Sequence, residues 1–82
     1  MTLAEIKEGN VAEIKKLSGG RGLIEKIQGF GLFVGSKVRL ERKAPFHGPL
    51  LVEDIENDAR IMIGRGMAAK VEVEVLESKK SR

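Results

Sequence analysis

The chain has 82 residues, of which 41% are hydrophobic and 33% charged, and it contains no cysteine, tryptophan or tyrosine. This length supports one domain with one small aliphatic core, and the hydrophobic share is too high for a disordered chain. The absence of cysteine excludes disulfides and thiolate metal sites. No apolar run approaches the roughly 18 residues of a membrane-spanning helix, and the acidic N-terminal stretch is unlike a signal peptide. We therefore expect a cytoplasmic protein that is not inserted in the membrane.

The formal net charge is +3, from 15 basic and 12 acidic residues. Three of the basic residues, Lys79, Lys80 and Arg82, follow the last apolar residue, so the rest of the chain is neutral by count. We expect residues 1–78 to form a single domain and residues 79–82 to be a disordered basic tail. Such a tail improves solubility and steers towards anionic surfaces, but it provides no docking face for nucleic acid.

The first predicted elements are a helical turn and a strand. Thr2 and Glu5 have the spacing of a capping box, so one turn of helix should begin at Thr2, with the apolar residues that follow it entering the core. Residues 11–17 alternate between apolar and polar side chains, which predicts a strand with Ala12 and Ile14 on its buried face.

A single helix is predicted over residues 21–30. Its apolar side chains recur one, three and three residues apart, and they are Leu23, Ile24, Ile27 and Phe30. Ser18 precedes the helix as the candidate N-cap. Gly31 can adopt the left-handed conformation that ends a helix, and Leu32 follows where a Schellman motif places an apolar contact.

Four further strands are predicted in the remainder of the chain. The segments with alternating apolar and polar residues are 37–44, 50–55, 59–63 and 71–75. Arg42 falls on the inward-facing parity, which indicates that the strand is frayed or at an edge there, and Pro45 ends the pairing because it has no N–H. A short helical turn at residues 67–70 precedes the last strand. Five short strands joined mostly by turns predict a mainly β fold, a bent antiparallel sheet that forms a partly open barrel with the helix over one end.

Six motifs between residues 30 and 71 carry a family resemblance that covers nearly the whole chain, from Leu3 to Leu76. They are Phe30-Gly31-Leu32, Val34-Gly35, Lys43-Ala44-Pro45, Gly48-Pro49-Leu50, Ile61-Met62-Ile63-Gly64-Arg65 and Met67-Ala68-Ala69-Lys70-Val71. In these motifs the chain resembles the ferrous iron transport protein A (FeoA) family. The resemblance implies a five-stranded SH3-like barrel. It also implies a small cytoplasmic accessory protein of ferrous iron uptake, which binds and modulates the cytosolic GTPase portion of the membrane Fe(II) transporter.

The predicted helix and its cap are the expected partner surface. The candidate residues are Ile24, Lys26, Ile27, Phe30, Leu32 and Phe33. The apolar arc of this short helix is wider than one barrel end can cover, and excess apolar surface on a small domain tends to mark an interface. The alternative is that these side chains pack into the barrel. The chain departs from the family pattern at Phe33, at Val34 and at the helix start, so partner choice could differ.

His47 is a weak candidate for a metal ligand, since it is the only histidine. One imidazole without cysteine cannot complete a four-ligand site of nitrogen and sulfur, and a solvated loop histidine is the simpler interpretation. Two acidic clusters, also more simply read as solvated, could supply hard oxygen ligands: Glu53, Asp54, Glu56, Glu72 and Glu74. We expect no required cofactor, and weak binding of Fe²⁺ or another divalent metal remains open.

Other functions were weighed against the accessory role. No set of nucleophile, base and orienting residue exists, which argues against an enzyme. A basic stripe of Lys37, Arg39 and Lys43 would suit a nucleic-acid-binding module, but few aromatic residues are available to stack on bases, and we expect no nucleic-acid partner. A metal-responsive regulatory domain, related to the C-terminal module of iron-dependent repressors, is a further alternative. Weak homo-oligomerisation also remains open.

Overall fold

The structure, a computed structural model, describes residues 1–78, and the predicted basic tail lies outside the described residues. The elements in chain order are β1 (Val11–Leu17), α1 (Arg21–Gly29), β2 (Lys37–Lys43), β3 (Leu50–Asp54), β4 (Ala59–Ile63), α2 (Arg65–Ala68) and β5 (Val71–Glu77). The five strands form one antiparallel sheet in the order β4-β3-β2-β1-β5. The predicted architecture is therefore confirmed. Within residues 1–78, no helix has the length and apolar character needed to cross a membrane.

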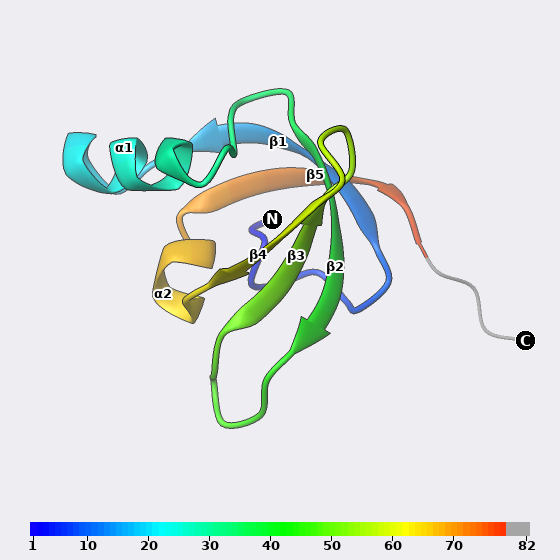
Figure 1. The fold of residues 1–82 in the computed structure, drawn as a ribbon. Helices are drawn as coiled ribbons and strands as arrows, with labels where there is room; N and C mark the ends of the chain where they lie inside the picture. Colours follow the sequence, from blue (N-terminus) through cyan, green and yellow to red (C-terminus); the bar gives the residue numbers. More distant parts are fainter. Residues whose placement is uncertain (79–82) are drawn as a thin grey trace, which may run out of the picture.

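The sheet curls around a single aliphatic core (Figure 1). The side chains with no more than 1% exposure are Leu3, Ile6, Ala12, Ile14, Ile27, Leu32, Val38, Leu40, Leu50, Val52, Ile63, Ala68 and Val71. The pairing of β2 with β3 shifts in register between Leu40 and Arg42, which leaves Arg42 exposed despite its inward parity. The strand does not fray there, because Arg42 pairs with Leu51. A second shift interrupts the pairing of β1 with β5 between Ile14 and Lys16. Such bulges increase the local twist and bend of a sheet, and here they help it to curl.

Residues 1–3 lie along the outer edge of β5. The N–H of Leu3 donates to the carbonyl of Val71 at 2.9 Å, and the N–H of Val73 donates to the carbonyl of Met1 at 2.8 Å. The predicted capping interaction is present, because the N–H of Thr2 donates to Oε1 of Glu5 at 2.7 Å. The segment forms one hydrogen-bonded turn that brings the first apolar side chains into the core.

Helix α1 ends in a Schellman motif, as the sequence predicts. Gly31 has a φ of 89°, and its N–H donates to the carbonyl of Gln28 at 2.8 Å. The N–H of Leu32 donates to the carbonyl of Ile27 at 3.4 Å. Leu32 and Ile27 both lie in the core, so the cap is fixed by hydrogen bonds and by packing.

The start of α1 differs from the prediction. Its N-cap is Gly20, with no side-chain hydrogen bond, whereas the hydroxyl of Ser18 donates to the carbonyl of Lys70 at 3.1 Å. The capping prediction was wrong because the end of β1 holds Ser18 against the start of β5. Figure 1 shows α1 reaching beyond the sheet, and Ile27 is its only fully buried residue. The helix therefore covers less of the barrel end than expected.

The second half of the chain follows the prediction with small differences. Strand β3 ends at Asp54, in line with the expected early end. Of the three residues of β4 that were predicted to face inward, only Ile63 is buried, since Ile61 is half-buried and Ala59 is exposed. Helix α2 begins at Arg65, two residues before the predicted turn.

Candidate partner-binding surface

Two of the six predicted partner-binding residues are not on the surface. Ile27 and Leu32 are both 0% exposed. The Schellman motif turns Leu32 back towards Ile27, so both side chains are used by the core and by the helix cap. For these two residues the prediction of a contact surface was wrong, and the alternative of packing into the barrel is correct.

The other predicted residues remain accessible on α1 and in the loop that follows it. Lys26 is exposed and Ile24 is half-buried, while Phe30 and Phe33 are 38% and 50% exposed. Val34, which was not predicted, is 63% exposed beside them in sequence. We call these five residues the cap surface. Its members are two aromatic residues, two aliphatic residues and one lysine.

The loop that carries Phe33 and Val34 is fixed to the sheet. The N–H of Phe33 donates to Oγ of Ser36 at 3.0 Å, and the N–H of Ser36 donates to the carbonyl of Phe33 at 2.9 Å. Gly35, with a φ of 97°, donates its N–H to the carbonyl of Ile14 at 2.8 Å. The exposed side chains of the cap surface are therefore presented by an ordered backbone.

Asp54 lies beneath the cap and was not recognised from the sequence. It is only 2% exposed, and its Oδ2 accepts a hydrogen bond from Nδ2 of Asn57 at 2.8 Å. Its Oδ1 has no hydrogen-bond partner among the described residues. A Cβ at Gly31 would lie 3.9 Å from Oδ2, which places the carboxylate next to the helix end. The solvated acidic cluster expected here was thus wrong for Asp54, whose parity with Leu50 and Val52 already pointed inward.

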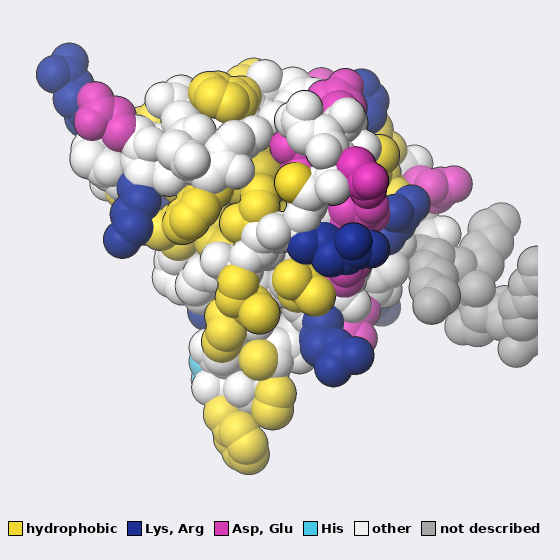
Figure 2. Space-filling view, in the orientation of Figure 1, with side chains coloured by type: hydrophobic (Ala, Val, Ile, Leu, Met, Phe, Trp, Pro, Cys, Tyr) yellow, Lys and Arg dark blue, Asp and Glu magenta, His cyan; other side chains and the backbone are white. Residues whose placement is uncertain are grey.

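A second apolar region follows the hairpin between β2 and β3. Figure 2 shows hydrophobic side chains from the projecting end of the hairpin up one face of the sheet. We call residues 44–49 the hairpin tip, and its Phe46 is 97% exposed. Beside the tip lies a shallow hollow of about 300 Å³, lined by Arg42, Ala44, Pro49, Leu51 and Met62.

Arg65, the first residue of α2, stabilises the hairpin tip through two hydrogen bonds. Nε of Arg65 donates to the carbonyl of Gly48 at 3.1 Å, and Nη2 donates to the carbonyl of Ala44 at 3.2 Å. Gly48 has no room for a side chain, because a Cβ there would lie 2.8 Å from that of Ala44. Phe46 and His47 have φ values of 59° and 58°, a conformation that costs non-glycine residues roughly 1–2 kcal/mol each.

The structure brings no metal cluster together around His47. This residue is exposed on the hairpin tip, and residues 1–78 contain no group of three or more His, Cys, Asp or Glu side chains placed to hold a metal ion.

Two of the three residues in the predicted basic stripe bond to other residues of the domain. Arg39 forms an ion pair with Glu53, and Nζ of Lys43 donates to the carbonyl of Ala4 at 2.9 Å. Lys37 is the one member of the stripe with neither contact among the described residues. The nucleic-acid alternative therefore gains no support from this face.

Three exposed ion pairs raise the pKa of two basic residues, Lys15 and Arg60. Nζ of Lys15 lies 3.4 Å from carboxylate oxygens of both Glu13 and Glu74, and the charge of Glu13 is the main cause of its raised pKa. Arg60 donates to Glu41 at 2.8 Å, and this hydrogen bond raises the pKa of Arg60. Exposed pairs of this kind contribute little to stability.

Comparisons with known proteins agree on one family. The FeoA domain family model matches residues 1–75. A Fe(2+) transport protein A of Methanocaldococcus jannaschii is 35% identical over 75 residues, which cover 92% of this chain and 87% of that protein. A crystal structure of the iron uptake regulatory protein FeoA superposes with a TM-score of 0.81 at 25% identity, over 92% of this chain and 95% of that one. The expected SH3-like, partly open barrel is therefore confirmed.

A metal-dependent regulator shares the same fold. The structure of the manganese regulator SloR superposes with a TM-score of 0.77 at 20% identity, over 90% of this chain. This chain spans only 34% of that protein. At such identity the likeness concerns the fold alone.

Proposed function

Because this chain belongs to the FeoA domain family, which is involved in Fe(2+) transport, we propose that it is an accessory protein of the membrane ferrous iron transporter. In this role it binds the cytosolic GTPase portion of the transporter and modulates it, on the cytoplasmic side of the membrane. The role is one of binding and assigns no catalysis to the chain. Ferrous ion is the cargo of the transporter, and any binding of Fe²⁺ to the accessory protein itself would be weak.

We assign the binding of the partner to the residues of the cap surface. Phe30, Phe33 and Val34 expose apolar area on a backbone that is already ordered. Preorganised aromatic side chains are efficient anchors in protein interfaces, since little conformational freedom is lost when they bind. Lys26 supplies a positive charge at the margin of the same surface, which would favour an acidic rim on the partner.

An NMR titration of the isotope-labelled protein with the isolated GTPase domain of the transporter tests the proposal. We expect amide shifts concentrated at residues 30–36 and at the last turn of α1. The absence of shifts at saturating GTPase domain would refute the accessory role. Parallel titrations with a short RNA and with Fe²⁺ separate the alternatives, because a nucleic-acid module would shift β2 and a metal site would shift the hairpin tip around His47.

A matched pair of variants locates the binding surface. Phe33→Ser removes an exposed ring and should weaken binding of the GTPase domain by at least about 30-fold, the loss expected for an anchoring aromatic. Phe46→Ser removes an equally large and more exposed ring from the hairpin tip and should leave this affinity unchanged. If Phe46→Ser abolished binding and Phe33→Ser did not, the role would stand but the cap surface would be the wrong site.

A further inference from the structure

The hairpin tip projects from the domain where β2 and β3 are joined (Figure 1). The side chain of Phe46 is 97% exposed there, so the ring has almost no packing within the described chain. Figure 2 shows that the apolar surface continues from the tip up the adjoining face of the sheet. Beside Phe46 this surface includes Pro45, Pro49, Leu51 and Met62. A continuous apolar patch at the end of a projecting loop indicates a surface that binds something.

The backbone of the tip has few free hydrogen-bonding groups. The N–H of Ala44 donates to the carbonyl of Pro49 at 2.9 Å, and the N–H of Gly48 donates to the carbonyl of Pro45 at 3.1 Å. Arg65 donates to the carbonyls of Ala44 and Gly48, and the two prolines have no N–H. Among the described residues, only Phe46 and His47 of the tip keep peptide groups without a partner.

This pattern suits a membrane better than it suits water. Lipid hydrocarbon offers no hydrogen bonds, so a loop that enters a membrane has to satisfy its peptide groups within the chain. The tip meets this condition at every residue except Phe46 and His47, and the oxygen atoms of lipid headgroups can accept from the remaining N–H groups. His47 is the one polar side chain of the tip, and its ring can lie at the headgroup level with its nitrogens in water.

The charges around the tip are mostly positive. Residues 42–52 and 59–68, which include the tip, β3 up to Val52, β4 and α2, contain no Asp or Glu. Arg42 and Lys43 precede the tip, and Arg65 bonds to it. Glu8 is the carboxylate that reaches the same place, where it accepts the N–H of Lys43 at 2.7 Å. Three cations therefore stand against one anion at the base of the tip.

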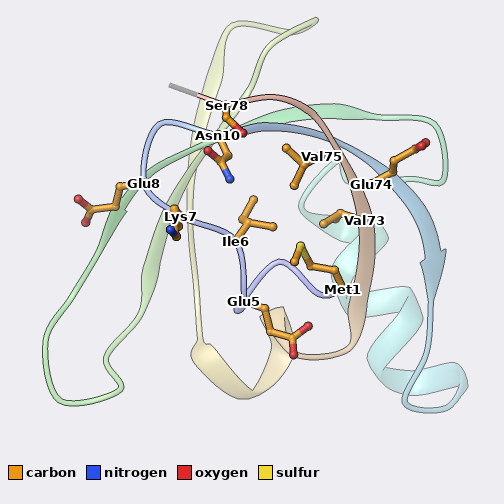
Figure 3. Close-up of a pocket in the computed structure, with 10 residues that line it drawn as sticks. All are labelled: Met1, Glu5, Ile6, Lys7, Glu8, Asn10, Val73, Glu74, Val75 and Ser78. Atoms are coloured by element: carbon orange, nitrogen blue, oxygen red, sulfur yellow. The ribbon is translucent and has the colours of Figure 1, made fainter. Parts of the chain in front are cut away.

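The region between the N-terminal turn and β5 differs in charge. Figure 3 shows the carboxylates of Glu5, Glu8 and Glu74 around it, with the ammonium of Lys7 among them. An anionic surface repels such a region and attracts the base of the tip. The charge distribution therefore favours one orientation of the domain, with the tip towards the anionic surface.

We propose that the hairpin tip docks the domain on an anionic membrane surface. The ring of Phe46 enters the boundary between headgroups and acyl chains, and the cations at the base of the tip contact acidic headgroups. One apolar anchor gives only marginal, reversible membrane binding, and a basic patch is the usual second signal. The contact goes beyond the proposed function, because it requires lipid and not the transporter.

Co-sedimentation with lipid vesicles tests the contact. We expect the wild-type protein to bind vesicles of equal parts phosphatidylcholine and phosphatidylglycerol, to bind vesicles of phosphatidylcholine alone much less, and to dissociate as the salt concentration rises. Phe46→Ser should weaken binding by at least about 10-fold, because its ring no longer leaves water. Arg42→Gln removes an exposed cation and should weaken binding by about 5-fold.

Lys16→Gln is the matched control for charge. Lys16 is also exposed, but Glu13 already pairs with Lys37 at the end of β2 opposite the tip, and Lys16 lies beyond that pair. This variant should bind vesicles like the wild type. Amide spectra of each variant confirm that it is folded.

A tryptophan at the tip reports its depth, because the chain has no tryptophan of its own. Phe46→Trp should still bind anionic vesicles, and its emission should shift to the blue and be quenched by brominated lipids. Phe33→Trp places the same reporter on the cap surface, and its emission should not change. A shift of the cap reporter in place of the tip reporter would overturn the proposal.

Two further results would also overturn it. One is a wild-type protein that does not bind anionic vesicles, and the other is a Phe46→Ser variant that binds them as well as the wild type. If Phe46→Ser instead lost affinity for the detergent-solubilised transporter while no variant bound vesicles, the tip would contact protein and not lipid. The titration with the GTPase domain contains no lipid, so the membrane contact and the accessory role can fail independently.

Discussion

The helix cap and the hairpin tip both present exposed aromatic rings, yet they are held in place by different means. At the cap, glycines take the left-handed conformations, and Leu32 anchors the turn in the core. At the tip, Phe46 and His47 take them, none of residues 44–49 is buried, and the turn depends on the guanidinium of Arg65. The cap is therefore packed into the core, whereas the tip projects from the domain and contributes no buried side chain to it.

Ile27→Ala, a substitution beneath the cap, should have the largest effect on the free energy of unfolding. The side chain is fully buried beneath the cap, and truncation of a core isoleucine lowers the free energy of unfolding by about 2–5 kcal/mol. Urea denaturation measures the loss. Ile24→Ala, on the same helix but only half-buried, is the control and should lose clearly less. Equal losses would mean that the core does not anchor the cap.

Gly31→Ala should have an intermediate effect. Its φ of 89° is unfavourable for alanine, so we expect a loss of about 1–2 kcal/mol in the free energy of unfolding. Gly22→Ala in the same helix is the matched control. No atom lies within 4 Å of a Cβ built there and its φ is not positive, so it should gain up to about 1 kcal/mol. Thermal or urea unfolding measures both variants. If both substitutions changed the free energy of unfolding in the same direction, the result would contradict the cap geometry.

Phe46→Asn should have the smallest effect on the free energy of unfolding. Unlike a core truncation, it should not lower it. Asparagine tolerates the left-handed conformation better than phenylalanine, and the lost ring has no packing within the chain, so the free energy of unfolding should stay the same or rise by up to about 1 kcal/mol. The same urea titration measures it. Phe30→Asn, at a helical φ of −83°, should instead be neutral or destabilising. A large loss at Phe46 would show that the ring stabilises its own domain.

Much of the fold follows from local sequence signals. The alternation of Val71, Val73 and Val75 with glutamates predicts β5, and Gly31-Leu32 predicts the helix cap, because strand parity and the Schellman motif depend on residues close in sequence. The resemblance to the FeoA family rests on such structural motifs. It identified the fold correctly, but it could not separate buried from exposed positions on α1.

The parts that sequence reasoning missed depend on contacts between distant segments. Ser18 looked like a helix cap, but its hydroxyl is taken by Lys70. Arg65 gave no local sign that it would hold the hairpin tip, since its two acceptors lie 17 and 21 residues away. Local patterns carry no information on which distant segment will bond to a given residue.

The pairing of the first and last strands has a consequence for synthesis. β1 lies between β2 and β5, and residues 1–3 bond to Val71 and Val73. A chain that leaves the ribosome N-terminus first cannot complete these pairs until β5 has emerged. Until then Leu3 and Ile14 lack the strand that covers them, and contacts between such distant residues form slowly. The nascent protein therefore exposes its apolar core until β5 has emerged, and loss of β5 by premature termination would leave a chain that aggregates or is degraded.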